Sequence, residues 1–200
     1  MTFPDLQART SSLAPAAGIF SVAFACLAMF VATPARAEAP SQYMQRVMNE
    51  LIAAQRSRSI SAFGNVLRKH MDVPGVGLSA LGPHARTLPK ADRPAYYSAM
   101  INFIAKYSAK ESSKYPVSGA VVTGQSSETA TGTDVDTQIT VDGTPYDVRW
   151  KVVRSGGALK VRDAQVIGVW ATSYINSLFQ DYIANNGNSP SALVLALNRY

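Results

Sequence analysis

The sequence predicts an α+β fold in which a curved antiparallel sheet of about four strands is covered by a layer of helices. Apolar residues recur at intervals of three and four before residue 116, alternate with polar residues up to residue 167, and return to helical spacing after Gly168. Turn sequences such as Asp142-Gly143 and Ser155-Gly156-Gly157 separate the alternating segments. Helices followed by a strand meander and then by further helices indicate an α+β domain.

Residues 1–37 are predicted to be a signal peptide, with cleavage after Ala37. The stretch from Ala14 to Val31 has no charged residue, and Ala35-Arg36-Ala37 places small residues where a signal peptidase requires them. The apolar run is nearly long enough to span a membrane, so an uncleaved membrane anchor is the alternative. Cys26 lies inside this run, which leaves residues 38–200 without cysteine. We expect those residues to form a single domain in the periplasm of a Gram-negative cell.

The positive charge of the chain is modest. Its net charge is +6, and without residues 1–37 it has 17 basic and 12 acidic residues, a net charge of +5. Nucleic-acid binding requires a denser basic patch in a recognisable module, so we exclude it. Three lysines share one predicted helix face: Lys106, Lys110 and Lys114. We interpret this face as a solvated surface, with attraction to anionic lipid headgroups or to an acidic partner as the alternative.

Three long helical segments and one short one precede the strands. Residues 40–56 carry apolar side chains at helical spacing, and Ser59 is the predicted cap of a second helix that ends before Pro74. The stretch that follows is rich in glycine and proline and is predicted to contain a short helix between two turns. Asp92 is the predicted cap of a long, largely buried helix that breaks at Lys114-Tyr115-Pro116.

Four strands are predicted, at residues 117–122, 135–141, 146–153 and 159–167. Gly168 ends the last strand, and a helix is expected from Val169 until Asn185-Asn186-Gly187. Ser189 and Pro190 then open a short final helix, with serine as its cap and proline in its first turn.

Candidate catalytic and metal-binding residues are few. The two histidines are His70, at a helix end, and His84, in a turn, and such isolated histidines are more often structural or solvated than catalytic. No cysteine or histidine pair has the spacing of a zinc site, and Asp134 with Asp136 supply too few oxygens for calcium. We therefore interpret these aspartates as part of an exposed hairpin and expect no metal.

Asp163 supports one enzymatic alternative. Together with a tyrosine it could imitate the carboxylate and oxyanion donor of isomerases that share a cone-like α+β sheet, an argument from fold analogy alone. Asp163 alternates with Arg162 along its strand, so their side chains are expected on opposite faces.

Apolar and aromatic residues are abundant in the predicted helices and strands. Tyrosine, tryptophan and methionine suit a loosely shaped apolar pocket, although the same residues at helical spacing are more often part of a core. The pattern alone therefore leaves a ligand cavity and a solid core as alternatives.

The order of these segments, and above all the stretch from Leu159 to Gly187, resembles the MlaC family, also called the toluene-tolerance auxiliary family. In that family the third strand and the next helix read approximately WKVYDVxIEGVSLVxNYRxQF, followed by a glycine and a leucine-rich end. The resemblance covers essentially the whole of residues 38–200. The matching residues are Lys160, Val161, Asp163, Gly168, Val169, Phe179 and Gly187. The sequence departs from the pattern at Leu159, Ile167, Trp170 and Asn176, where the family has tryptophan, glutamate, serine and arginine.

The resemblance implies an NTF2-like sheet with an added helical part, and a periplasmic lipid carrier without a cofactor rather than an enzyme. Such a carrier takes a phospholipid from an outer-membrane lipoprotein complex and delivers it to an inner-membrane ABC transporter complex, with the acyl tails held between sheet and helices. The residues expected to contact the lipid are Phe63, Leu67, Met100, Ile104, Trp150, Val166, Trp170 and Tyr174.

Three alternatives to a phospholipid carrier stay open. Trp170 stands where the family has a small residue and could reshape the mouth of the pocket, which makes a polycyclic lipid of the hopanoid type a competing ligand. The other two alternatives are a small-molecule isomerase or hydrolase on an NTF2-like sheet and a periplasmic interaction module without a ligand.

Overall fold

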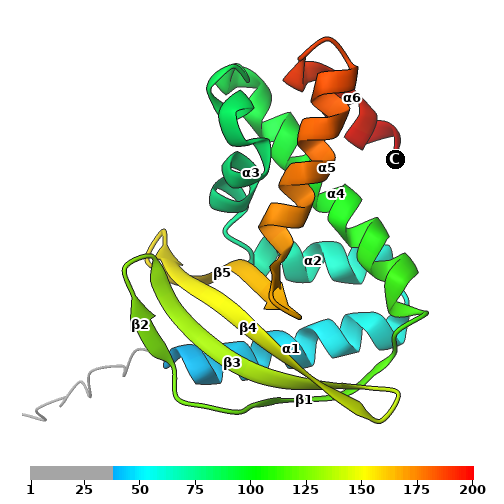
Figure 1. Cartoon of the computed structure of the whole chain (residues 1–200). Helices are drawn as coiled ribbons and strands as arrows, with labels where there is room; N and C mark the ends of the chain where they lie inside the picture. Colours follow the sequence, from blue (N-terminus) through cyan, green and yellow to red (C-terminus); the bar gives the residue numbers. More distant parts are fainter. Residues whose placement is uncertain (1–37) are drawn as a thin grey trace, which may run out of the picture. The chain divides into compact units, whose positions relative to one another are not determined.

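The structure, a computed structural model, describes residues 38–200 and confirms an α+β fold (Figure 1). Its helices are α1 (Pro40–Ser57), α2 (Ile60–His70), α3 (Val73–Leu81), α4 (Arg93–Ser112), α5 (Ala171–Asn185) and α6 (Pro190–Arg199), with short 3-10 helices η1 (Gly82–Arg86) and η2 (Lys90–Asp92). Its strands are β1 (Val117–Val122), β2 (Ser127–Thr129), β3 (Gly132–Val141), β4 (Thr144–Ser155), β5 (Ala158–Val166) and β6 (Val169–Trp170).

The strands form one antiparallel sheet in the order β1-β3-β4-β5-β6, and β2 pairs with β3. The predicted hairpin at Asp142-Gly143 joins β3 to β4, with positive φ at both residues, as a two-residue turn of type I′ requires. The four main strands are the predicted ones, whereas the short strands β2 and β6 were not expected. β2 and β6 each pair over only two or three residues, too few to produce a recognisable alternation in the sequence.

Strand β6 corrects the predicted start of the following helix. We expected helix from Val169, but Val169 pairs with Val166 and Trp170 with Gln165, so the chain first turns back on β5. Ile167 and Gly168 form this turn, both with positive φ. Helix α5 begins only at Ala171.

A β-bulge in β5 breaks the alternation that the sequence predicts. Val152 pairs with Val161 and Lys151 with Asp163, which leaves Arg162 as an extra residue on its strand. Such an insertion reorients the side chains next to it. Arg162 and Asp163 therefore both line one hollow, described below, instead of pointing to opposite faces.

Three predicted helix caps have different outcomes. The hydroxyls of Ser59 and Ser189 accept hydrogen bonds from the backbone N–H groups of Ala62 and Ala192, at 3.2 and 3.3 Å, so both serines cap their helices as predicted. Asp92 stands at the N-cap position of α4 as predicted, but its carboxylate makes no capping hydrogen bond. η2 leads directly into α4, and Asp92 already has helical backbone angles, so its side chain is not placed over the helix end.

The helices contribute to three separate clusters of buried side chains. α1 packs on the sheet through a cluster of Tyr43, Met44, Val47, Val135 and Val152. α3, α4, α5 and α6 share a separate core that contains Tyr96, Met100, Phe179 and Leu193. A third, smaller cluster joins α1, α2 and α4 around Phe63 and Ala105. Because the core is divided in this way, space is left where the clusters meet.

Residues 1–37, with the predicted signal peptide and its cleavage after Ala37, lie outside the described residues. Within residues 38–200, no helix combines the length and the apolar character needed to cross a membrane.

Candidate functional site

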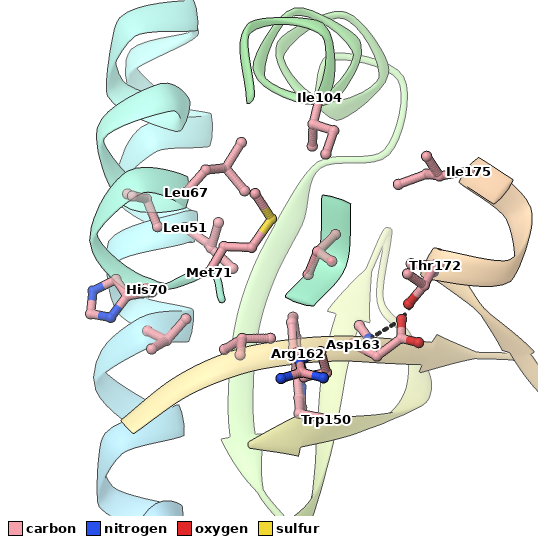
Figure 2. A pocket seen from close by; sticks show the side chains of 16 residues that line it. Leu51, Leu67, His70, Met71, Ile104, Trp150, Arg162, Asp163, Thr172 and Ile175 are labelled. Atoms are coloured by element: carbon pink, nitrogen blue, oxygen red, sulfur yellow. Dashed lines mark hydrogen bonds between the residues drawn. The ribbon is translucent and has the colours of Figure 1, made fainter. Parts of the chain in front are cut away.

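An apolar hollow of about 160 Å³ lies between the sheet and the helices (Figure 2). Trp150 from β4 lies on the sheet side, Ile104 reaches in from α4, and Ile175 comes from α5. An engineered apolar cavity of roughly 150 Å³ stays dry and takes a benzene-sized molecule. This hollow is therefore suited to hydrocarbon rather than to water. The other apolar side chains that line it are Val47, Leu51, Val66, Leu67, Met71, Val76, Val161, Ala164 and Ala171.

A second hollow of about 290 Å³ adjoins the first. Leu51 and Trp150 line both, so the two hollows meet at these side chains. Phe63, Ile52 and Ile139 are among the further apolar side chains of the second hollow. Small-molecule pockets range over roughly 300–1,000 Å³, and the two hollows together fall within this range.

The ring of Trp150 is held in place by a hydrogen bond beneath it. Its indole Nε1 donates to Thr137 Oγ1 at 2.9 Å, and the Thr137 hydroxyl donates to the carbonyl of Val148 at 3.2 Å. The one polar group of the indole is thereby satisfied by the sheet itself. The rest of the ring presents hydrocarbon to both hollows.

An ion pair between buried Asp72 and Arg162, whose side chain is 41% exposed, joins the start of α3 to β5. The carboxylate of Asp72, which is 4% exposed, accepts hydrogen bonds from the Arg162 guanidinium, and Ser155 Oγ donates to its other oxygen at 3.3 Å. Arg162 lines the first hollow as well. Gly75 leaves room for this pair, because a Cβ there would lie 2.3 Å from both Arg162 Nε and Asp72 Oδ2.

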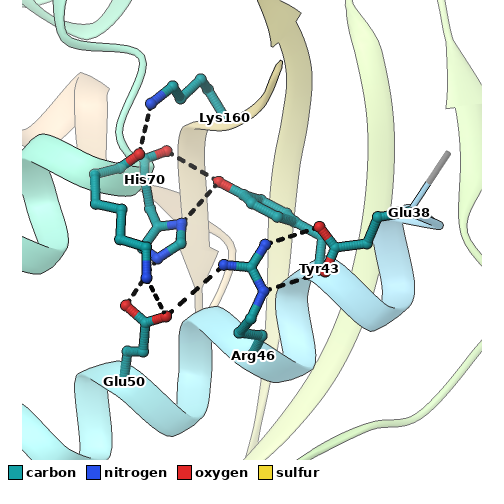
Figure 3. A network of polar contacts seen from close by, with 7 residues as sticks. Glu38, Tyr43, Arg46, Glu50, His70 and Lys160 are labelled. Atoms are coloured by element: carbon teal, nitrogen blue, oxygen red, sulfur yellow. Dashed lines mark hydrogen bonds and ion pairs between the residues drawn. The ribbon is translucent and has the colours of Figure 1, made fainter. Parts of the chain in front are cut away.

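His70 links the wall of the first hollow to a polar network on α1 (Figure 3). Its Nε2 lies 2.9 Å from Glu50 Oε2 and its Nδ1 lies 3.3 Å from the hydroxyl of Tyr43, which donates to the His70 carbonyl at 3.2 Å. Glu50 also accepts a hydrogen bond from Lys69 at 2.7 Å. His70 is thus structural, as its isolation in the sequence suggested.

Burial determines the protonation state of this network. Desolvation of the imidazole lowers the pKa of His70, and this effect outweighs the opposing attraction of Glu50. Burial also raises the pKa of Tyr43 to about 12. For Glu50, burial opposes ionisation, but the hydrogen bonds from Lys69 and His70 outweigh it and lower the pKa of the carboxyl. The hollow is therefore bordered by a neutral histidine at neutral pH.

Asp163 acts as a helix cap in this structure. Its Oδ1 accepts hydrogen bonds from the backbone N–H of Thr172 at 3.0 Å and of Ala164 at 2.9 Å (Figure 2). The side chain fixes the first turn of α5 against β5.

The two aspartates of β3 lie in the β3–β4 hairpin, as interpreted, and each forms an ion pair across it; Asp136 is 45% exposed, whereas Asp134 is only 17% exposed. Asp134 pairs with Lys151, and Asp136 forms a two-pronged pair with Arg149, at 2.7 and 2.9 Å. The guanidinium lowers the pKa of Asp136. In residues 38–200, no three histidine, cysteine or acidic side chains are grouped so that they could hold a metal ion.

Four of the eight predicted lipid contacts line the hollows. Leu67 and Ile104 lie in the wall of the first, Phe63 in the wall of the second, and Trp150 between them. The structure thus places these four side chains in the walls of the hollows. Their contact with a lipid stays a prediction.

The other four predicted contacts lie outside the walls of both hollows. Met100 is fully buried in the α3–α6 core, where Tyr96 donates to its sulfur at 3.7 Å. Val166 and Tyr174 are 40% and 50% exposed. Trp170 lies beside the Lys151 ammonium, which is 5.9 Å from the ring centroid. The suggestion that Trp170 narrows the pocket therefore has no support in this geometry.

Several wall residues are missing from the eight predicted lipid contacts, among them Leu51, Met71 and Ile175. Leu51 and Ile175 follow the same helical spacing as their buried neighbours, and spacing does not distinguish a wall from a core. Met71 forms an isolated bridge with Val161 after α2 ends. Only the register of that bridge brings it to the hollow.

Comparison with known proteins identifies a family and solved structures of similar fold. A family model described as "MlaC protein" matches residues 40–199. One solved structure of similar fold is a phospholipid-binding protein from Ralstonia solanacearum in complex with a phospholipid, with 18% sequence identity, a TM-score of 0.60, and coverage of 81% of this chain and 96% of the other. No curated protein matches the sequence.

Proposed function

The chain belongs to the MlaC family, and from this premise we propose that it is a periplasmic lipid carrier. It shields the acyl tails of a phospholipid and moves the lipid between outer-membrane and inner-membrane components of an Mla system, a lipoprotein complex on one side and an ABC transporter complex on the other. It carries out no reaction. The Ralstonia protein of similar fold holds a phospholipid, which supports this choice of ligand.

The observation that carries the proposal is the pair of adjoining apolar hollows between sheet and helices. Burying a CH₂ group is worth about 0.8 kcal/mol, so two ordinary acyl chains cost on the order of 20 kcal/mol to expose to water. Unassisted passage through water is correspondingly slow. A carrier needs an apolar space and no catalytic group, and these hollows supply that space.

We assign the acyl contacts to residues that line the hollows. Leu67, Ile104 and Phe63 form walls on α2 and α4, and Leu51 with Trp150 lie where the two hollows meet. An acyl chain that passes from one hollow to the other must contact Leu51 and Trp150.

The carrier is tested by extracting the purified protein, residues 38–200, with organic solvent and identifying the lipid by mass spectrometry. We expect phospholipid at close to one molecule per chain. Protein that contains no lipid and takes none up from a phospholipid dispersion would rule out the carrier function. A hopanoid at the same stoichiometry would replace the phospholipid as the ligand.

A substitution that fills the space between the two hollows tests whether the lipid binds there. Leu51→Trp places a larger side chain where the two hollows meet, and we expect it to lower the bound phospholipid at least fivefold. Leu195→Trp is the matched control, because Leu195 is 60% exposed on α6, away from the hollows. Equal lipid content in the two variants would place the ligand elsewhere.

A further inference from the structure

The hairpin that joins β5 to β6 has an unfavourable residue at its tip. Val166 and Val169 pair across a two-residue turn made of Ile167 and Gly168, with φ of 50° and 77°. This is the geometry of a type I′ turn, in which asparagine is the preferred first residue. A β-branched side chain with positive φ is an outlier, because its Cβ substituents crowd the backbone.

Packing within the domain does not compensate for this strain. The Ile167 side chain is 79% exposed, more than any other large apolar side chain of residues 38–200. Its neighbours Val166 and Val169 are 40% and 58% exposed. The tip is therefore an apolar projection that burial in the fold does not stabilise, and strained, exposed residues of this kind are found at functional sites.

The tip is continuous with the wall of the first hollow. Ala164, two residues before Val166, lines the hollow, and so does Ala171, two residues after Val169. Tyr174, in the first turn of α5, adds a phenol that is 50% exposed. In Figure 1 the end of β5 lies beside the start of α5, so tip and wall occupy the same edge of the molecule.

We infer that the Val166–Val169 hairpin docks the protein on a phospholipid bilayer by inserting its apolar tip into the headgroup region. The inference deepens the proposed carrier function and rests on it, because insertion would bring the wall of the hollow to the membrane that holds the donor or acceptor complex. Aliphatic side chains with an adjacent tyrosine are the composition that partitions into this region of a membrane.

Size favours a bilayer over a protein as the partner. A stable protein interface takes about 20–30 residues a side, whereas the tip offers three aliphatic side chains. On the sheet face beside the tip, Asp136 and Arg149 neutralise each other, which leaves Asp147 as the adjacent charge. The net charge of +5 over residues 38–200 provides a general attraction to anionic lipid.

Ile167→Asn tests the inference without endangering the fold. Asparagine suits the first position of a type I′ turn, so we expect the variant to be at least as stable as the wild type. The probe is flotation of residues 38–200 with vesicles of phosphatidylglycerol and phosphatidylethanolamine, without the apolar N-terminal stretch that would itself bind. We expect the wild type to float with the vesicles and Ile167→Asn to bind at least tenfold more weakly.

The control variant is Ile60→Asn, which removes another isoleucine, 48% exposed at the start of α2. It should float as the wild type does. Wild-type protein that contains phospholipid but does not float would overturn the inference and leave the carrier function intact. Equal flotation of Ile167→Asn and the wild type would overturn it too. Flotation without any bound or acquired phospholipid would instead refute the carrier function.

Discussion

At the scale of single residues, the close approach of Gly75 to the Asp72–Arg162 pair predicts that a larger side chain at this position destabilises the protein. Gly75→Ala would place a Cβ 2.3 Å from atoms of both partners, so α3 must shift or the ion pair must break. Because Arg162 is 41% exposed, the main cost is that the buried Asp72 carboxylate loses its partner, and leaving a buried group unpaired costs about 1–3 kcal/mol. We expect a loss of about 2 kcal/mol in the free energy of unfolding. Urea denaturation measures this loss.

Gly64→Ala is the control for that substitution. Gly64 also lies within a helix, but its Cβ would meet only the mobile end of Arg68, at 3.0 Å. Alanine favours helix by about 0.5–1 kcal/mol over glycine, so this variant should be as stable as the wild type or slightly more stable. A similar loss in both variants would show that helix geometry, not the ion pair, demands Gly75.

The stability of the domain is expected to depend on pH through His70. Burial lowers its pKa below the value of 6.5 expected in the unfolded chain. Below pH 6.5, His70 therefore takes up a proton in the unfolded chain, whereas in the folded protein it stays neutral until the pH is lower. The free energy of unfolding falls as the pH is lowered from 6.5 to the pKa of the folded protein. The charged and titratable groups around the imidazole are Tyr43, Arg46, Glu50 and Lys69.

Thermal melting between pH 5 and 7.5 checks this dependence. We expect the melting temperature to fall on the acid side, and His70→Gln to reduce that fall even if the variant is less stable throughout. Glu50 contributes in the same direction, since its lowered pKa makes its stabilisation disappear at still lower pH. An unchanged acid slope in His70→Gln would assign the dependence to other groups.

At the scale of elements, α1 satisfies the free edge of the sheet. Gln45 Oε1 accepts from the backbone N–H of Val122 at 3.3 Å, and its Nε2 donates to the carbonyl of Ala120 at 3.1 Å. Gln55 accepts from the backbone N–H of Val117 at 3.2 Å in the same way. Edge strands left unpaired promote association, and these two amides take the place of a neighbouring strand.

Gln45→Met tests this contact between helix and strand. The side chain keeps its size but loses both hydrogen bonds, and leaving partly buried backbone groups unpaired costs about 1–3 kcal/mol. We expect a loss of about 2 kcal/mol in urea denaturation and faster amide exchange at Val122. Gln125→Met, at an exposed position before β2, is the control and should change neither quantity.

The elements themselves could mostly be predicted from the sequence, whereas their irregularities could not. Ser59 and Ser189 marked helix starts because a cap is a local contact. The bulge at Arg162 could not be recognised in the alternation of apolar and polar residues, because it depends on the register between β5 and β4. The turn at Ile167 was missed because its first residue is not one that such turns prefer.

At the scale of the whole molecule, the site could be predicted only in part. Met100 and Ile104 lie one turn apart on α4, yet the first is in the solid α3–α6 core and the second in the wall of the hollow. Both belong to an apolar helix face, and periodicity reports burial without saying where packing leaves space. That information comes from the division of the core among α1 with the sheet, α1 with α2 and α4, and α3–α6.

A ligand held between these clusters should stabilise the whole domain. Binding to the folded state alone adds about 2.7 kcal/mol at a ligand concentration 100 times the dissociation constant. For a domain of this size, that raises the melting temperature by roughly 5–10 °C. We expect this rise when delipidated protein is titrated with a short-chain phosphatidylglycerol below its micelle concentration, measured by scanning calorimetry.

The Leu51→Trp variant separates binding in the hollows from binding at the surface. Because its side chain fills the space where both hollows meet, its melting temperature should stay constant as the lipid is added, while Leu195→Trp should follow the wild type. A surface site would stabilise all three proteins alike. A rise in Leu51→Trp equal to that of the wild type would therefore show that the acyl chains do not pass between Leu51 and Trp150.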